Sequence, residues 1–484
     1  MASTPDGRTS TGGPVPASAG QPSAAARFLQ FVPLGAVAVL LLDAATDFFP
    51  DDPITGVLTP TRLVLLIGLT AMAVPAPGRP RARLRDFRTR LDIPVGLLLV
   101  ASVLATYGGG HPTAPLRGLL TVIACYYLVV GLRRTQPESW RAVGLLALAG
   151  VAAAGTGAFS QFTNDTPTGF CRTGLLTDIA CDAGGGDVLI RSTGTFANPN
   201  LLAAFLVLLL PFTLLAAVAV DERTARTAIV VLGVVGYGAM LTTFSRAGYV
   251  AAAAGLLVLG GAYWFAPRLA DRTGRRLVAG IGLGGLLAAS AAIWLASRAG
   301  NSLGVRGQAW RAALDLAPHN PLGVGLGRSG AVITATAPGD RVFVHAHNLW
   351  LNWLVETGPL GLLAIGAVTV IAWTSAARAA RAKSVVGTVG LASLTGFFLM
   401  SMLDHPANLD RIDVLFWCVL AVVMAEAPTG RRRGAEPPAE TVPARQRHRR
   451  HAPAAPEPAG LTTRFALPPN QSNGPWLQGP PTGP

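Results

Sequence analysis

The sequence predicts an all-α, polytopic membrane protein with about twelve transmembrane helices, two long extracytoplasmic loops and disordered tails. Three observations support this class. Hydrophobic residues make up 51% of the 484 residues and charged residues only 13%, about half of what a soluble domain usually carries. The apolar residues gather in runs of about 20, the length that crosses a bilayer as a helix. Most basic residues lie in the short segments between these runs.

Twelve apolar segments of suitable length follow one another along residues 27–427, which we expect to form one membrane domain. Polar, glycine or proline residues separate them. The expected spans lie near 28–48, 61–76, 92–107, 115–132, 142–161, 199–220, 227–244, 247–265, 277–297, 348–373, 384–403 and 411–427.

The two ends of the chain have a different composition. Residues 1–26 are small, polar and rich in proline and glycine, and they lack the charged start and apolar core of a signal peptide. Residues 428–484 are basic and proline-rich. Such segments bury too little apolar surface to fold, so we expect both tails to be disordered.

The distribution of basic residues predicts how the chain is oriented. Of the 39 lysines and arginines, 28 lie in the tails and in alternate loops, which places these segments and both termini in the cytoplasm. The net charge of +14 is then explained by topology, so we expect no nucleic-acid partner. The long loops near 162–198 and 298–347 fall outside, and loops of this length are usually functional.

Two cysteines, Cys171 and Cys181, share the first of these outer loops. A disulfide between them is expected on the oxidising side of the membrane, and two free thiols are the alternative. Cys125 and Cys418 lie inside apolar runs, where we expect them to be inert.

Arginines are few on the predicted outer side, and those that remain there need a reason. Arg191, Arg246 and Arg306 are the candidates for binding an anionic ligand, because a guanidinium stays charged and matches phosphate oxygens in pairs. For Arg246, at the end of a span, snorkelling to lipid headgroups is the alternative. Asn198, Pro199 and Asn200 are typical of a helix start.

The stretch from His345 to Gly361 is the main concentration of polar groups beside a predicted span, and such groups are costly near a membrane. His347 is suited to act as a general base near neutral pH. A metal site formed by His345 and His347, with His319 or His405, is the alternative. Trp350 is typical of an interfacial aromatic residue.

These segments resemble the O-antigen ligase and polymerase family. Its signature of His, then Asn, nine residues and Gly-x-x-Gly fits His347, Asn348 and Gly358-Pro-Leu-Gly361. Arg191 with the GTFANPN stretch, the TFSRAG stretch around Arg246, and Arg306 with Trp310 and Pro321 to Gly327 resemble its other outer motifs in order. The resemblance covers about residues 150–425.

The resemblance implies a metal-independent, inverting glycosyltransferase without a cofactor. The donor would be a glycan linked through diphosphate to a polyprenol, and the acceptor a glycan, lipid, protein or wall component at the outer face. His347 would act as the base and Arg246, Arg191 and Arg306 would bind the diphosphate. Supporting roles would fall to Asn348, His345, Asn198, Asn200 and Trp350. Gly358 and Gly361 would allow a bend from a surface helix into a span.

Two other functions remain open from the sequence. A solute transporter would suit twelve spans, but the polar groups gather at one face rather than in two interrupted helices near the midplane. A non-catalytic scaffold for envelope assembly would use the basic tail to bind acidic lipids or partners.

Overall fold

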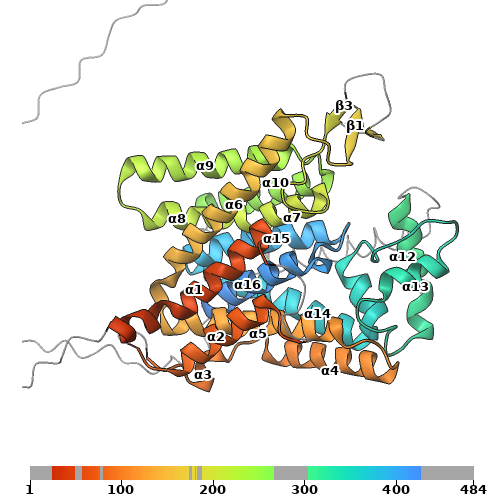
Figure 1. Cartoon of the computed structure of the whole chain (residues 1–484), viewed down its shortest axis with the longest axis horizontal. Coiled ribbons are helices and arrows are strands. Elements are labelled where there is room, and N and C mark those ends of the chain that lie inside the picture. The colour runs from red at the N-terminus through yellow and green to blue at the C-terminus, as the bar shows by residue number, and fades with distance from the viewer. Residues whose placement is uncertain are drawn as a thin grey trace, which may run out of the picture. The chain divides into compact units, whose positions relative to one another are not determined.

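The computed structural model describes residues 24–49, 57–76, 80–173, 177–179, 181, 188–265 and 304–426, and these are almost entirely helical (Figure 1). Each predicted span within them is a helix or a run of helices, and the ninth, near 277–297, lies outside the described residues. The two predicted tails, 1–26 and 428–484, also lie outside the described residues, except that the first helix begins at Ala24. The apolar elements are α1 (Ala24–Thr46), α2 (Pro60–Ala73), α4 (Asp92–Gly108), α5 (Ala114–Thr135), α6 (Trp140–Thr163), α7 (Pro199–Leu209), α8 (Thr213–Ala219), α9 (Arg223–Leu241), α10 (Arg246–Phe265), α14 (Leu349–Arg381), α15 (Val385–Ser401) and α16 (Asp410–Glu426).

Six helical segments of the described chain are long and apolar enough to cross a membrane. Four shorter apolar helices, α2, α4, α10 and α15, accompany them. The short 3₁₀ elements are η1 (Pro137–Ser139), η2 (Leu210–Phe212), η4 (Ala317–His319) and η5 (Pro406–Asn408), and α3 (Leu84–Phe87) is a single turn. The six long segments run over Phe28–Thr46, Ala114–Thr135, Pro137–Thr163, Pro199–Ala219, Arg223–Leu241 and Leu349–Arg381. These findings support a multi-pass membrane protein.

Small residues let these helices pack closely, as is common where helices meet in a membrane. A side chain on Gly144 of α6 would collide with the backbone of Ala216 in α8. Likewise, a side chain on Gly396 of α15 would meet the carbonyl of Ala251 in α10. The predicted span 199–220 is not one continuous helix, because α7 passes through η2 at Pro211 before α8.

Helix α14 is bent at Gly358, which confirms the bend predicted there. Gly358 has φ of 68° inside the helical run, a conformation that favours glycine. A side chain on Gly358 would meet the carbonyl of Pro321, and one on Gly323 the carbonyl of Glu356. The glycines of the two predicted motifs therefore allow the backbones of these two segments to come into contact. Gly361 is not itself bent but leaves no room for a side chain beside Thr357.

The two segments predicted as long loops contain regular structure. The first forms a small antiparallel sheet in the order β2-β1-β3, with β1 (Cys171–Thr173), β2 (Thr177–Ile179) and β3 (Val188–Ile190). A disulfide joins Cys171 to Cys181. Sheet pairing sets Cys171 opposite Ile190, next to Arg191. The second segment forms α12 (Val305–Leu316) and α13 (Ser329–Thr336), which lie beside the first half of α14 (Figure 1).

The cysteine arrangement predicts a thiol count. Cys125 and Cys418 are buried and reduced, while Cys171 and Cys181 are bonded to each other. If the purified protein is unfolded in the presence of an alkylating reagent, we expect two labelled thiols per chain by mass spectrometry, and four after prior reduction. In Cys171→Ser, three thiols should label without reduction. Four labelled thiols in the unreduced wild-type chain would contradict the disulfide.

Candidate functional site

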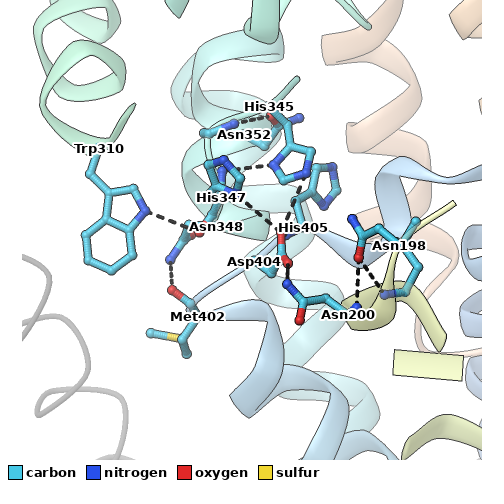
Figure 2. A network of polar contacts seen from close by, with 12 residues as sticks. Asn198, Asn200, Trp310, His345, His347, Asn348, Asn352, Met402, Asp404 and His405 are labelled. Carbon is cyan, nitrogen blue, oxygen red and sulfur yellow. Dashed lines mark hydrogen bonds and ion pairs between the residues drawn. The ribbon is translucent and has the colours of Figure 1, made fainter. Parts of the chain in front are cut away.

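Three histidines and one aspartate meet where the lead into α14 faces the turn between α15 and α16 (Figure 2). The Nε2 of His345 lies 3.6 Å from the Oδ1 of Asp404, and the Nδ1 of His347 lies 3.5 Å from the same oxygen. The backbone N–H of His405 donates to this oxygen at 2.8 Å. The side chain of Asp404 is 11% exposed and that of His347 is 26% exposed. The carboxylate is therefore an inner group, and His347 is the histidine that faces outward.

The cap of α14 positions the two segments that form this cluster, the lead into α14 and the turn between α15 and α16. Asn348 caps α14 by accepting the N–H of Leu351 at 3.0 Å, so the span predicted near 348–373 begins at this residue. Its Nδ2 also donates to the carbonyl of Met402 at 2.9 Å, just before Asp404. Asn348 thus fixes the residue at which α14 begins and also the distance between the start of α14 and the α15–α16 turn.

His347 has an unusual backbone conformation. Its φ is 50°, in the left-handed region that non-glycine residues enter rarely and that is over-represented at functional sites. The indole N–H of Trp310, on α12, donates to the His347 carbonyl at 3.2 Å. The strained turn is thereby held from a separate helix.

The protonation of His345 follows from its contacts. The backbone N–H of His347 donates to the Nδ1 of His345 at 3.0 Å, so this nitrogen must carry a lone pair. The proton of the neutral ring then lies on Nε2, facing Asp404. Burial lowers the pKa of His345 to about 4, and the nearby charge of Arg306 acts in the same direction. At neutral pH a neutral imidazole therefore faces the carboxylate.

Asp404 keeps its charge despite its position. Burial by itself would raise the pKa of the Asp404 carboxyl, but His347, His345 and the His405 amide stabilise the anion and hold the pKa well below its usual range. Burial lowers the pKa of His405 to about 3, so this ring is also neutral. The carboxylate is the fixed negative charge of the site, and it faces the Nδ1 of His347.

The GTFANPN segment enters the same site from α7. Asn198 caps this helix by accepting the N–H groups of Asn200 and Leu201, at 2.7 and 3.3 Å, as predicted for a helix start. Asn200 then donates from Nδ2 to the Oδ2 of Asp404 at 3.3 Å, and its Oδ1 accepts from Arg191 at 3.4 Å. A second bond from Arg191, to the Thr243 carbonyl at 3.0 Å, links it to the segment before Arg246.

The predicted arginines are placed differently from one another. Arg191 is half-buried and connected through Asn200 to Asp404. Arg306 is half-buried on α12 and lies near His345; its Nε is buried without a hydrogen-bond partner in the described structure. Arg246 is the first residue of α10 and is exposed, and no described contact joins it to the histidine cluster.

Trp350 makes its described contacts with residues outside the cluster. Its indole N–H donates to Thr369 across the bend of α14 at 3.2 Å, and its ring packs against Phe398. These contacts fit a role in helix packing. Sequence reasoning missed Asp404, although an Asp-His pair between two apolar segments on the predicted outer side is an available signal.

His345, His347 and Asp404 also form the one group in the described residues with the composition of a metal site, their ligand atoms lying within 4.8 Å of one another. A histidine that binds a metal through one nitrogen carries a proton on the other, which then donates to a neighbour. The Nδ1 of His345 instead accepts a backbone N–H. The arrangement thus fits a carboxylate that orients two imidazoles better than it fits a metal ion.

Comparison with known proteins identifies one segment of the chain. Residues 227–366 match the family model described as O-antigen ligase, and no curated protein matches the chain. The matched segment runs from α9 into α14 and includes Arg246, Arg306 and His347, whereas Arg191 and Asp404 lie outside it. Residues 227–366 of the chain are thus similar to the O-antigen ligase family, the family that the sequence motifs resemble.

Proposed function

We propose that this protein transfers a glycan from a polyprenyl-diphosphate carrier to an acceptor hydroxyl at the outer face of the cytoplasmic membrane. The match of residues 227–366 to the O-antigen ligase family model supports glycan transfer of the ligase or polymerase type. The observation that carries the finer proposal is the pairing of His347 with Asp404. Because Nδ1 faces the carboxylate at 3.5 Å, Nε2 remains available to an acceptor.

In the proposed step, the acceptor oxygen attacks the anomeric carbon of the donor glycan while the bond from that carbon to the diphosphate oxygen breaks. The acceptor proton moves to the Nε2 of His347, and the polyprenyl diphosphate leaves with the bonding electron pair. Asp404 stabilises the imidazolium that results, as a carboxylate does beside a catalytic histidine. A single displacement of this kind inverts the anomeric centre. No metal or cofactor takes part in the proposed step.

The arginines have the complementary role in this proposal. Charge grows on the diphosphate as it leaves, and cations fixed in place beforehand stabilise that charge most effectively. Arg306 is supported by its place on α12 near His345, and Arg191 by its link through Asn200 to Asp404. Arg246, exposed at the start of α10, is the third arginine that we propose to bind the diphosphate.

Loss of the proposed base should stop turnover. In His347→Ala and His347→Asn we expect consumption of a polyprenyl-diphosphate glycan to fall by roughly 10²- to 10⁴-fold, the usual contribution of a general base. Asparagine is included because it tolerates the positive φ of this position. The measurement is loss of lipid-linked donor by the purified protein.

The control for this variant is His319→Ala. His319 is bonded to the carbonyl of Asp315, outside the cluster, and its loss should leave turnover unchanged. Unchanged turnover in His347→Asn would exclude the base assignment. Donor binding without turnover by the wild-type chain would favour a carrier or scaffold over an enzyme.

The Asp404–His347 pair predicts that the negative charge at residue 404 is needed for turnover. In Asp404→Asn the side chain keeps its size but no longer stabilises the imidazolium formed in the proposed step, so the maximal rate of donor consumption should decrease. Donor consumption by Asp404→Asn at the wild-type rate would argue against the pair.

The proposed diphosphate contact of Arg246 predicts that lysine is a poor replacement. Arg246→Ala should lower turnover by roughly 10²- to 10³-fold, the loss typical of one donor to a developing anion, and Arg246→Lys nearly as much, because lysine lacks the planar fork. Arg223 is the matched control, since it is likewise exposed at the first residue of a helix. Full activity of Arg246→Lys would exclude a paired contact with the diphosphate.

A further inference from the structure

A second buried polar cluster lies next to the turn that carries His347, and the proposed reaction does not use it. Ser329 begins α13, while Asn352 and Glu356 lie one turn apart on the first half of α14. All three are buried, with exposures of 1%, 1% and 6%. Polar groups buried this deeply are costly unless their hydrogen bonds are complete. The way they satisfy one another is therefore informative.

The hydrogen bonds of this cluster can be assigned from the atoms involved. Asn352 Oδ1 accepts the backbone N–H of Ala346 at 3.2 Å, which fixes it as the amide oxygen. Ser329 Oγ lies 2.8 Å from this oxygen and 2.7 Å from Oε1 of Glu356. A hydroxyl has one proton to donate, yet it faces two oxygen atoms at hydrogen-bond distance. Both contacts are hydrogen bonds only if Glu356 supplies the second proton.

The same cluster controls the segment before His347. The bond from Ala346 to Asn352 ties down the residue that directly precedes His347. On the other side, the backbone carbonyl of Glu356 accepts the N–H of Gly325 at 3.1 Å, which joins the glycine-rich segment to α14. The turn of His347 is thus held by Asn352 from α14 and by Trp310 from α12.

We propose that Glu356 is a neutral carboxylic acid that donates a hydrogen bond to Ser329. We further propose that the series of hydrogen bonds from Glu356 through Ser329 to Asn352 positions His347 for proton transfer. Glu356 and Asn352 are positioning residues, because they act through the backbone that precedes His347. The catalytic consequence rests on the proposed function, whereas the protonation of Glu356 and the tethering of the turn do not.

The first experiment tests the proton without using activity. A protonated carboxylic acid gives an infrared carbonyl band that shifts in deuterium oxide, and a carboxylate does not. We expect the difference spectrum of wild type minus Glu356→Gln, in detergent at neutral pH, to contain this band. A difference spectrum with only carboxylate bands would overturn the neutral assignment.

The second experiment tests the tether. In Asn352→Ala, hydrogen exchange of a peptide covering residues 343–349 should speed up, whereas Ser393→Ala should leave it unchanged. Ser393 is a matched control because it is also fully buried and loses one bond, to the carbonyl of Leu208. Unchanged exchange in Asn352→Ala would overturn the positioning role.

The third experiment reads the consequence for turnover. Asn352→Ala and Glu356→Ala should lower kcat by about 10- to 100-fold with little change in KM, as expected when a catalytic group is displaced by a fraction of an ångström to about 1 Å. Glu356→Gln should retain most of the wild-type kcat, because the amide N–H replaces the acid proton. Equal loss in Glu356→Gln and Glu356→Ala would overturn the proposal. If the wild-type chain consumes no donor, the proposed function fails, and the infrared and exchange results still decide this inference.

Discussion

The Asp404 carboxylate is the constraint on which the arrangement of the site depends. A buried anion is costly unless neighbouring groups satisfy it, and Asp404 is satisfied by segments that are far apart in the sequence. His345 and His347 come from the lead into α14, Asn200 from α7, and the His405 amide from its own turn. Because one carboxylate holds all of them, the three segments form one site.

Residues at the ends of helices bring these groups together. Asn198 caps α7 and so places Asn200, two residues later, against Asp404. Asn348 caps α14 and also donates to the Met402 carbonyl, which fixes the distance between the two turns. The bend at Gly358 then lets the first half of α14 carry the site while the second half continues as an apolar helix. Capping and bending are therefore part of how the site is built.

Two separate sets of contacts act on His347, and they have different purposes. Asp404 faces the imidazole itself, where its charge would favour the protonated ring formed in the proposed proton transfer. Trp310 and the buried cluster of Ser329, Asn352 and Glu356 act on the backbone around it. A strained backbone persists only where its surroundings determine it fully, and His347 meets that condition.

The sequence by itself determined the membrane class, the positions of the apolar helices within the described residues, the cap at Asn198 and the bend at Gly358. These follow from local properties, namely hydrophobic length, capping chemistry and the conformational freedom of glycine. The pairing of His347 with Asp404 and the link from Arg191 through Asn200 were decided only by the tertiary structure. Residues 57 positions apart in the chain meet because α14, α15 and α16 pack together, and no local pattern records which side chains such packing brings face to face.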